Sequence, residues 1–323
     1  MELKIPDSYL QEEEREGFVI AGMMKRSWAT KLKMISAIDE ILTDHGIRWF
    51  ADYGTLLGAV RHRGFIPWDD DFDISLFRED YDRALTILEA ELPANYKIGR
   101  FGRNQFDQPL SAINNRWYID TGDDPKEAAI TAEFYGNPYA DIIDVFPLDY
   151  IPRDKEEREG LLIIYDVLMK AVKVGDGMRQ VGLLSEYAEQ IHALTGQEIP
   201  VDERFLPAVC GIMSMLGKMY TREDAVGIEN LSNMTDHARN RWRQLAWYDH
   251  AVRLPFEMIR VPVPAGYREL LQANYGSAWM SPVKNSAGHG YPFYARQQRM
   301  IDKYKENRDK AGKHPLREDC DRC

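Results

Sequence analysis

The sequence predicts an α+β fold in which helices and strands alternate around a mixed sheet and a large helical insertion interrupts the core. Three observations predict this class. Apolar residues recur at helical spacing over residues 27–45, short strand-like segments separate such helices up to about residue 150, and from about residue 155 helical patterns follow one another. The same alternation would also suit an α/β fold.

Length, composition and charge narrow the class of protein. The chain has 323 residues, 44% of them hydrophobic, enough for one large domain with an insertion or for two closely packed domains. Its net charge of −11 argues against a general nucleic-acid binder, which would need a basic face. Glu12–Glu14 stand where the apolar part of a signal peptide would begin, and no apolar run reaches the roughly 18–20 residues of a membrane span. A cytoplasmic location is expected, with peripheral contact at the inner membrane surface as an option.

The three cysteines fit a reducing compartment. Cys210 lies in an apolar run and is expected in the core. Cys320 and Cys323 form a Cys-x-x-Cys pair at the end of the chain, which would suit zinc or a disulfide. No second pair accompanies it, so we interpret it as incidental.

The first half of the chain alternates its elements. A helix is expected over 27–45, a strand over 47–53, a turn at Gly54 into a short helix, and a helix over 78–92. Further strands are expected near residues 96–101, 115–120 and 140–147.

The second half is mainly helical. Helices are expected over residues 156–174, 183–195, 204–219, 221–231 and 235–247. Arg239, Arg241 and Arg243 alternate around the last of these and are interpreted as solvated. A strand over 258–263 and a helix over 266–275 follow, and the charged tail from about residue 302 is expected to end in a loose segment. The predicted units are a core (1–150), a helical insertion (151–250), a segment that returns to the core (251–301) and a tail (302–323).

The most informative stretch is residues 52–74, DYGTLLGAVRHRGFIPWDDDFDI. Asp69, Asp71 and Asp73 are spaced two apart, so in an extended chain their carboxylates share one face, whereas Asp70 points to the other side and is expected to hold the local backbone. Three like charges repel each other unless a cation lies between them, and Mg²⁺ prefers oxygen ligands. The pattern favours a metal-assisted phosphoryl or nucleotidyl transferase.

An acidic run on a solvated surface is the ordinary alternative. Here Phe72, Ile74 and Leu76 alternate with Asp71 and Asp73, which predicts a half-buried strand with one apolar face and one face of carboxylates. Acids on such a strand, beside aromatic residues, favour a functional site.

The turn before the acids adds features that suit phosphate. Gly54 allows the backbone to approach a ligand closely, and N–H groups at the start of a helix attract phosphate, so Gly54 and Thr55 are candidate phosphate-binding residues. Arg61, His62 and Arg63 follow at the helix end. They either pair favourably with the helix dipole or neutralise a diphosphate.

The run from Asp52 to Ile74 closely resembles the signature of the LicD family of phosphocholine transferases, which is related to fukutin and the fukutin-related protein. About twenty nearly continuous positions agree. Weaker similarity lies in residues 144–149 and in a late segment that runs from Pro255-Phe256-Glu257 to Tyr275-Gly276. The resemblance implies a core similar to the nucleotidyltransferase fold of polymerase-beta type.

Within this resemblance Asp71 and Asp73 are the expected metal ligands, joined by Asp69, for Mg²⁺ with Mn²⁺ as an alternative. Asp144, on a neighbouring strand, is the expected third wall and a candidate catalytic residue. The fallbacks for that wall are two acids of the same segment, Asp141 and Asp149.

The resemblance also implies a reaction. A CDP-linked donor such as CDP-choline would pass phosphocholine, or a similar phospho-alcohol, to a hydroxyl of a glycan or lipid-linked glycan and release CMP, as in lipopolysaccharide or teichoic acid synthesis. Asp73 or Asp144 would take the hydroxyl proton. Lys284 and His289, in a late loop rich in Pro and Gly, would close over the nucleotide.

Two other functions stay open at this point. One is true nucleotidyl transfer from CTP or another NTP with release of pyrophosphate, which the same metal site would serve. The other is a non-catalytic nucleotide- or glycan-binding protein on a retired enzyme fold. The residues leave open the donor alcohol, the acceptor, the general base and the oligomeric state.

Overall fold

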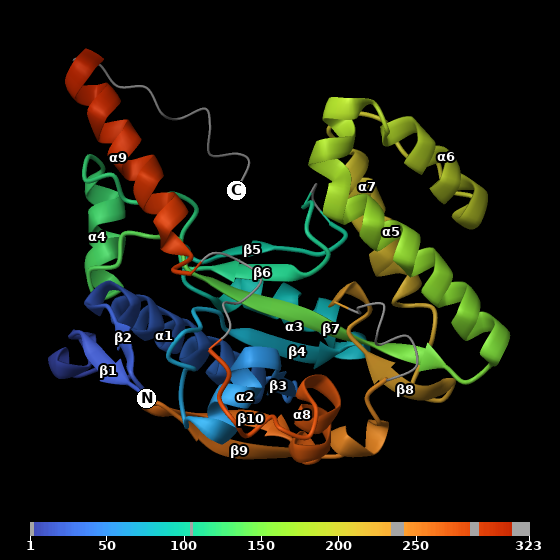
Figure 1. The fold of residues 1–323 in the computed structure, drawn as a ribbon, viewed down its shortest axis with the longest axis horizontal. Coiled ribbons are helices and arrows are strands. Elements are labelled where there is room, and N and C mark those ends of the chain that lie inside the picture. The colour runs from blue at the N-terminus through green and yellow to red at the C-terminus, as the bar shows by residue number, and fades with distance from the viewer. Residues whose placement is uncertain (1–2, 104–105, 234–241, 285–290, 312–323) are drawn as a thin grey trace.

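A mixed sheet lies at the centre of the computed structural model, which describes residues 3–103, 106–233, 242–284 and 291–311 (Figure 1). Its strands are β3 (Trp49–Ala51), β4 (Asp73–Phe77), β5 (Lys97–Gly99), β6 (Ser111–Asn114), β7 (Ile142–Pro152) and β8 (Ala225–Glu229). The order is β3-β4-β7-β6-β5, and β8 also pairs with β7. β4 and β7 are parallel and the other neighbours antiparallel. The predicted α+β class with a mixed sheet core is confirmed.

Apart from a separate helical group, the described part of the chain has six helices. They are α1 (Gly22–Asp44), α2 (Tyr53–Arg61), α3 (Arg78–Glu91), α4 (Pro125–Glu133), α8 (Tyr267–Tyr275) and α9 (Tyr294–Ala311). Two hairpins lie outside the sheet, β1 (Glu13–Arg15) with β2 (Phe18–Ile20), and β9 (Ala251–Phe256) with β10 (Ile259–Pro264). Short 3₁₀ turns occupy Asp7–Leu10, Leu231–Asn233 and Leu245–Tyr248.

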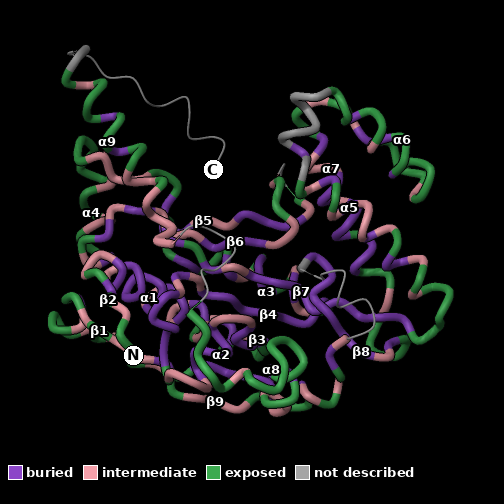
Figure 2. Tube along the Cα trace, viewed as in Figure 1, coloured by how far each residue is buried: buried purple, intermediate pink, exposed green. Residues whose placement is uncertain are grey.

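The core forms where the amphipathic helices meet the sheet. Trp28, Leu32, Ile35 and Ile38 recur along α1 at helical spacing, and all four are fully buried. α1 packs against α3 and β7, and α3 packs against β4 and β7. Figure 2 shows the sheet strands as buried, while α9 and α6 carry exposed faces. The interior strands β4 and β7, which carry Asp73 and Asp144, are therefore held in place by the core.

A separate group of helices forms the other end of the molecule. It consists of α5 (Lys155–Val181), α6 (Leu184–Thr195) and α7 (Phe205–Leu216). α6 and α7 pack on α5, which contacts β7, and the group stands apart from α9 in Figure 1. Cys210 is buried there, as predicted. The hairpin β9–β10 lies beside β3. The division of the chain into core, insertion and returning segment stays a prediction.

Several predicted elements differ from the structure. The strand expected at 115–120 is β6, which lies a few residues earlier, and the helix expected at 221–231 contains strand β8. β8 is apolar enough for either state, and pairing with β7 decides it. The helix expected over 235–247 falls mainly on residues outside the described part, and its end is a 3₁₀ turn.

A further correction concerns the site. The segment of β4 was expected to be half buried, but all five of its residues are buried, because β3 and β7 flank it and helices pack upon it. The charged tail from about residue 302 was expected to end in a loose segment. α9 runs to Ala311, with Ile301 and Tyr304 buried, and the end of the tail lies outside the described residues. None of the helices in the described residues has the combination of length and apolarity needed to cross a bilayer.

Candidate functional site

The turn between β3 and α2 is built around a buried carboxylate. Asp52 is the N-cap of α2, and its side chain accepts the N–H of Tyr53 at 2.8 Å. Tyr53 adopts a positive φ of 41°, which is rare for a residue with a Cβ and marks a tight turn. Arg243 pairs with Asp52 at 2.5 Å and with Glu229 at 3.0 Å. The interpretation of Arg243 as solvated is wrong, since only 2% of it is exposed.

Gly54 lets an acid approach the start of α2. A Cβ at this position would collide with Oδ2 of Asp69, so only glycine allows this carboxylate so close to the helix. At the next residue, Oγ1 of Thr55 accepts the N–H of Asp73 at 2.8 Å. These two contacts join the first turn of α2 to the acidic segment. The backbone of α2 and the carboxylates thus form one unit.

The acids lie partly in an irregular segment rather than all on a strand. β4 begins only at Asp73, so the expected alternation of three acids along a strand is wrong for Asp69 and Asp71. The carboxylates nevertheless gather, because one oxygen from each of Asp69, Asp70 and Asp71 lies within 4.8 Å of the others. A turn held by Gly54 brings together what the extended chain was expected to align.

Asp73 and Asp144 face each other across neighbouring strands. They are register partners in the parallel pair β4–β7, so their side chains leave the sheet on the same face. Burial, together with the charges of Asp71 and Asp144, raises the pKa of Asp73 well above its ordinary value. Burial and the charge of Asp71 raise the pKa of Asp69 to about 7. These carboxyl groups therefore resist ionisation unless a cation lies between them, and carboxylate oxygens are the ligands that a hard divalent cation prefers.

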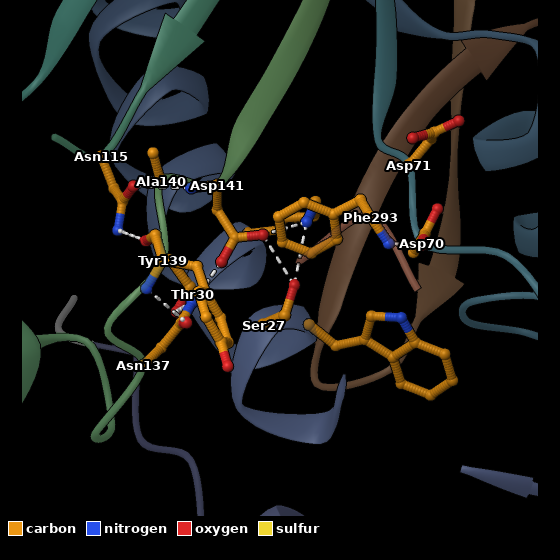
Figure 3. A network of polar contacts seen from close by, with 12 residues as sticks. Ser27, Thr30, Asp70, Asp71, Asn115, Asn137, Tyr139, Ala140, Asp141 and Phe293 are labelled. Atoms are coloured by element: carbon orange, nitrogen blue, oxygen red, sulfur yellow. Dashed lines mark hydrogen bonds and ion pairs between the residues drawn. The ribbon is translucent and has the colours of Figure 1, made fainter. Parts of the chain in front are cut away.

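Asp70 was expected to point away from the other acids and hold the local backbone, but it gathers with Asp69 and Asp71 and binds a distant backbone group. Its Oδ2 accepts the N–H of Phe293 at 2.6 Å, and the residue is 1% exposed (Figure 3). This hydrogen bond fastens the segment before α9 to the acids.

The two fallback acids lie in buried ion pairs instead. Asp141 pairs with Lys31 and accepts hydrogen bonds from Ser27 at 2.6 Å and from Asn137 (Figure 3). Asp149 pairs with Arg78. Burying such a charge is costly unless a partner compensates it, so these contacts support the fold. Of the three acids considered for this wall, Asp144 lines the cavity beside the acidic cluster.

That cavity has a volume of about 660 Å³, which suits a small-molecule ligand. Asp70, Asp71 and Asp144 bring carboxylates to it. Lys31, Arg296 and Arg299 also line it, together with the aromatic residues Phe72, Tyr291 and Phe293. The cavity thus combines acids from the segment before β4 and from the start of β7 with cations from α1 and α9.

The predicted phosphate-binding cations lie elsewhere. Nη1 of Arg61 donates to the carbonyl of Trp279 at 3.0 Å. Nε2 of His62 lies 3.3 Å from Oε1 of Glu16. Nζ of Lys284 lies 5.8 Å from the ring centre of Trp68. None of Arg61, His62 and Lys284 is among the described residues that line the cavity. Burial and the neighbouring Arg61 lower the pKa of His62, so its imidazole is neutral at pH 7. His289, Cys320 and Cys323 lie outside the described residues.

Sequence reasoning missed the cations of α9 and the aromatic residue that ends α8. Arg296 and Arg299 are three residues apart after an aromatic run, a helical spacing that could have indicated the start of α9. Burial and the charges of Asp73, Asp52 and Asp69 raise the pKa of Tyr275, which places it near the acids although 42% of the residue is exposed. Tyr275 belongs to the late segment of weak similarity.

Another part of that late segment supports the loop after α2. Oε1 of Glu257 accepts the N–H of Phe65 at 3.2 Å and pairs with Arg15 at 2.6 Å. A Cβ on Gly64 would collide with this carboxylate, so the glycine allows the contact. Residues about 190 positions apart therefore fix one turn.

Comparison with known proteins confirms the resemblance predicted from residues 52–74. Residues 46–113 match the family described as LicD/FKTN/FKRP, nucleotidyltransferase domain. The chain is 47% identical over 45 residues to the lipopolysaccharide cholinephosphotransferase LicD of Haemophilus influenzae, which covers 14% of this chain and 17% of that protein. It is 35% identical over 83 residues to the ribitol-5-phosphate transferase FKTN of Mus musculus, 25% of this chain and 18% of that protein. An uncharacterized protein of Rickettsia typhi is 37% identical over 95 residues, 28% of this chain and 31% of that protein. The chain matches less than a third of the length of each of these relatives.

Proposed function

We propose that this chain, which carries a nucleotidyltransferase domain of the LicD/FKTN/FKRP family over residues 46–113, moves phosphocholine or a similar phospho-alcohol from a CDP-linked donor to a hydroxyl of a glycan. The products are a phosphodiester and CMP. Two relatives support this class of reaction by name, one a cholinephosphotransferase and one a ribitol-5-phosphate transferase. The acceptor is a glycan or lipid-linked glycan of lipopolysaccharide or teichoic type. We place the reaction in the cytoplasm, at the inner membrane surface.

One observation carries the proposal. Asp73 and Asp144 meet across β4 and β7, Asp69 and Asp71 lie beside them, and the glycine turn at Gly54 adjoins the cluster. Carboxylates from two strands next to a helix start form a place where a diphosphate and a cation fit together.

Asp69, Asp71 and Asp73 would hold a divalent cation, Mg²⁺ or alternatively Mn²⁺. Their fit rests on donor chemistry, because oxygens of Asp69 and Asp71 lie within 4.8 Å of each other, Asp69 adjoins Gly54, and the charges of both acids act on Asp73. When bound, the cation supplies charge neutralisation on the diphosphate.

The residues of the chain then position the reactants. Gly54 allows the diphosphate to approach the backbone at the start of α2, where free N–H groups favour negative charge. Asp73 or Asp144 accepts the proton of the acceptor hydroxyl. The hydroxyl oxygen bonds to the phosphorus next to the alcohol, and the bond from that phosphorus to the oxygen of CMP breaks in line with it. Catalysis comes mainly from positioning and electrostatics, as is general for phosphoryl transfer.

The two alternatives predict different products. In true nucleotidyl transfer an acceptor attacks the α-phosphate of an NTP and pyrophosphate leaves. A binding protein would take up a nucleotide or a glycan and release nothing. Retention of Asp69, Asp71, Asp73 and Asp144 in one cluster favours an enzyme, since a retired active site has no need of repelling acids.

The test is product analysis with the purified chain. It is incubated with CDP-choline, CDP-ribitol, CDP-glycerol or CTP, a mixture of glycan acceptors and Mg²⁺, and then with EDTA in place of Mg²⁺. We expect CMP from one of the CDP-alcohols and none with EDTA. Release of pyrophosphate from CTP would replace the proposal with nucleotidyl transfer. If neither product forms and the CDP-alcohols cause no thermal shift, the donor assignment is wrong.

A further inference from the structure

We propose that the cavity between the acids and α9 holds a phosphate group, bound by Arg296 and Arg299. This inference deepens the proposed function, because it assumes that the reaction takes place at the acidic side of the same cavity. The cavity of about 660 Å³ is lined by Asp71 and Asp144 and also by these two arginines. Its size leaves room for a ligand between the carboxylates and the guanidinium groups.

The two arginines act together because of their spacing. Residues three apart on a helix are neighbours on its surface, so Arg296 and Arg299 present two guanidinium groups side by side. Within the described residues neither arginine makes an ion pair with an acid, and both are exposed. Guanidinium groups match the geometry of phosphate oxygens and bind them in pairs.

The start of α9 is held firmly against the cavity, so the arginines have a fixed place. The side-chain amide of Gln297 accepts the N–H of Ala140 at 2.9 Å and donates to its carbonyl at 3.0 Å. Tyr294 stacks on Tyr139, with ring centres 4.8 Å apart. Asp70 holds the N–H of Phe293 at 2.6 Å. A site on such a fixed element pays little ordering entropy when the ligand binds.

The distribution of charge favours an anion at this end of the cavity. Lys31 also lines the cavity, but Asp141 already compensates its charge. The positive potential near α9 therefore comes from Arg296 and Arg299. The same phosphate chemistry has two sources, the diphosphate of the donor or a phosphate ester on the acceptor, and the experiment separates them.

The experiment measures binding of inorganic phosphate by calorimetry in EDTA, for the full chain and for the double variant R296A/R299A. The matched control is K303A/K305A, which removes two exposed cations farther along α9 that do not line the cavity. We expect phosphate to bind the unaltered chain and the control alike, and the cavity variant to bind about tenfold or more weakly. Absence of phosphate binding, or equal loss in both double variants, would overturn the inference.

A second titration identifies the source of the phosphate and keeps this inference separate from the proposed function. Phosphate is titrated into the chain saturated with CDP and Mg²⁺. Continued binding assigns the arginines to a phosphorylated acceptor, and loss of binding assigns them to the diphosphate of the donor. If phosphate binding depends on the arginines while no CDP-alcohol is consumed, this inference stands and the proposed function fails. If R296A/R299A and the unaltered chain consume CDP-alcohols equally, and phosphate does not bind, the proposed function stands and this inference fails.

Discussion

Asp73 and Asp144 are register partners on the parallel strands β4 and β7, although 71 residues separate them in the chain. Their carboxylates share one face of the sheet, and the charges of Asp71 and Asp69 add to the repulsion on Asp73. Such an arrangement costs stability in the absence of a cation. It therefore links a functional requirement to a measurable property of the fold.

The first prediction follows from this repulsion. Asp73→Asn removes a carboxyl group whose ionised form is disfavoured by burial and by neighbouring like charges, so the protein without metal should melt about 2 °C or more higher, while turnover of CDP-alcohol should fall about 100-fold or more. Differential scanning fluorimetry in EDTA and CMP release measure the two effects. The control is Glu189→Gln, which removes one exposed charge on α6 and should change neither value. A variant that melts lower and keeps its activity would contradict the prediction.

The second prediction concerns Gly54. In Gly54→Ala the added Cβ collides with Oδ2 of Asp69 and should displace this carboxylate from the cluster. Metal affinity, measured by calorimetry with Mn²⁺, should fall about tenfold, and CMP release should fall with it.

Gly160→Ala is the matched control, because nothing lies within 4 Å of a Cβ built at this helical position. It should leave metal affinity unchanged and stabilise α5 slightly, since alanine is the better helix former. Unchanged metal affinity in Gly54→Ala would show that the position of Asp69 does not matter for the cation.

The third prediction concerns the buried pair behind the turn. Arg243→Met leaves Asp52 and Glu229 buried without their cation, so it should lower the free energy of unfolding by about 3–5 kcal/mol. Urea denaturation measures this loss. Arg243→Lys keeps a positive charge but loses one of the two contacts. Its free energy of unfolding should lie between those of the unaltered chain and Arg243→Met.

An exposed ion pair provides the comparison for that variant. Arg204 pairs with Asp202 on the surface, and Arg204→Met should leave the urea midpoint unchanged. Equal midpoints for Arg243→Met and the unaltered chain would mean that the pair with Asp52 does not support the fold.

The fourth prediction concerns His62. Burial lowers its pKa below the ordinary value of 6.5, so the unfolded chain binds a proton more readily than the folded one. The contribution of His62 to stability should therefore be complete above pH 6.5 and be lost as the pH falls towards its folded pKa. NMR titration of the imidazole should give a value below 6.5, and His62→Gln should remove this part of the pH dependence. A pKa above 7 would instead restore His62 as a cation for phosphate.

Local patterns predicted much of the fold. The apolar spacing over residues 27–45 predicted α1, which differs mainly in starting at Gly22, and the helices at 183–195 and 204–219 differ from α6 and α7 by only a few residues. The family resemblance was carried by one stretch, residues 52–74, and the family match spans residues 46–113. These features succeed because helical periodicity and a nearly continuous motif are properties of neighbouring residues.

Other features depend on partners that are distant in the chain. Ala225–Glu229 was taken for a helix, but it is a strand because β7 offers it hydrogen-bonding partners. Arg243 was taken for a solvated residue, but its partner Asp52 lies 191 positions away. α9 was not predicted as a helix, although the structure buries its Ile301 and Tyr304.

The sequence by itself determined the resemblance to the LicD family, the α+β class and the set of acids from Asp69 to Asp73, because each of these is written in residues close together in the chain. Only the tertiary structure decided that Asp144, rather than Asp141 or Asp149, lines the cavity with Asp70 and Asp71. It also decided that Arg296 and Arg299 lie there. The physical reason is that strand register and helix docking are set by packing across the whole core, which local spacing does not encode.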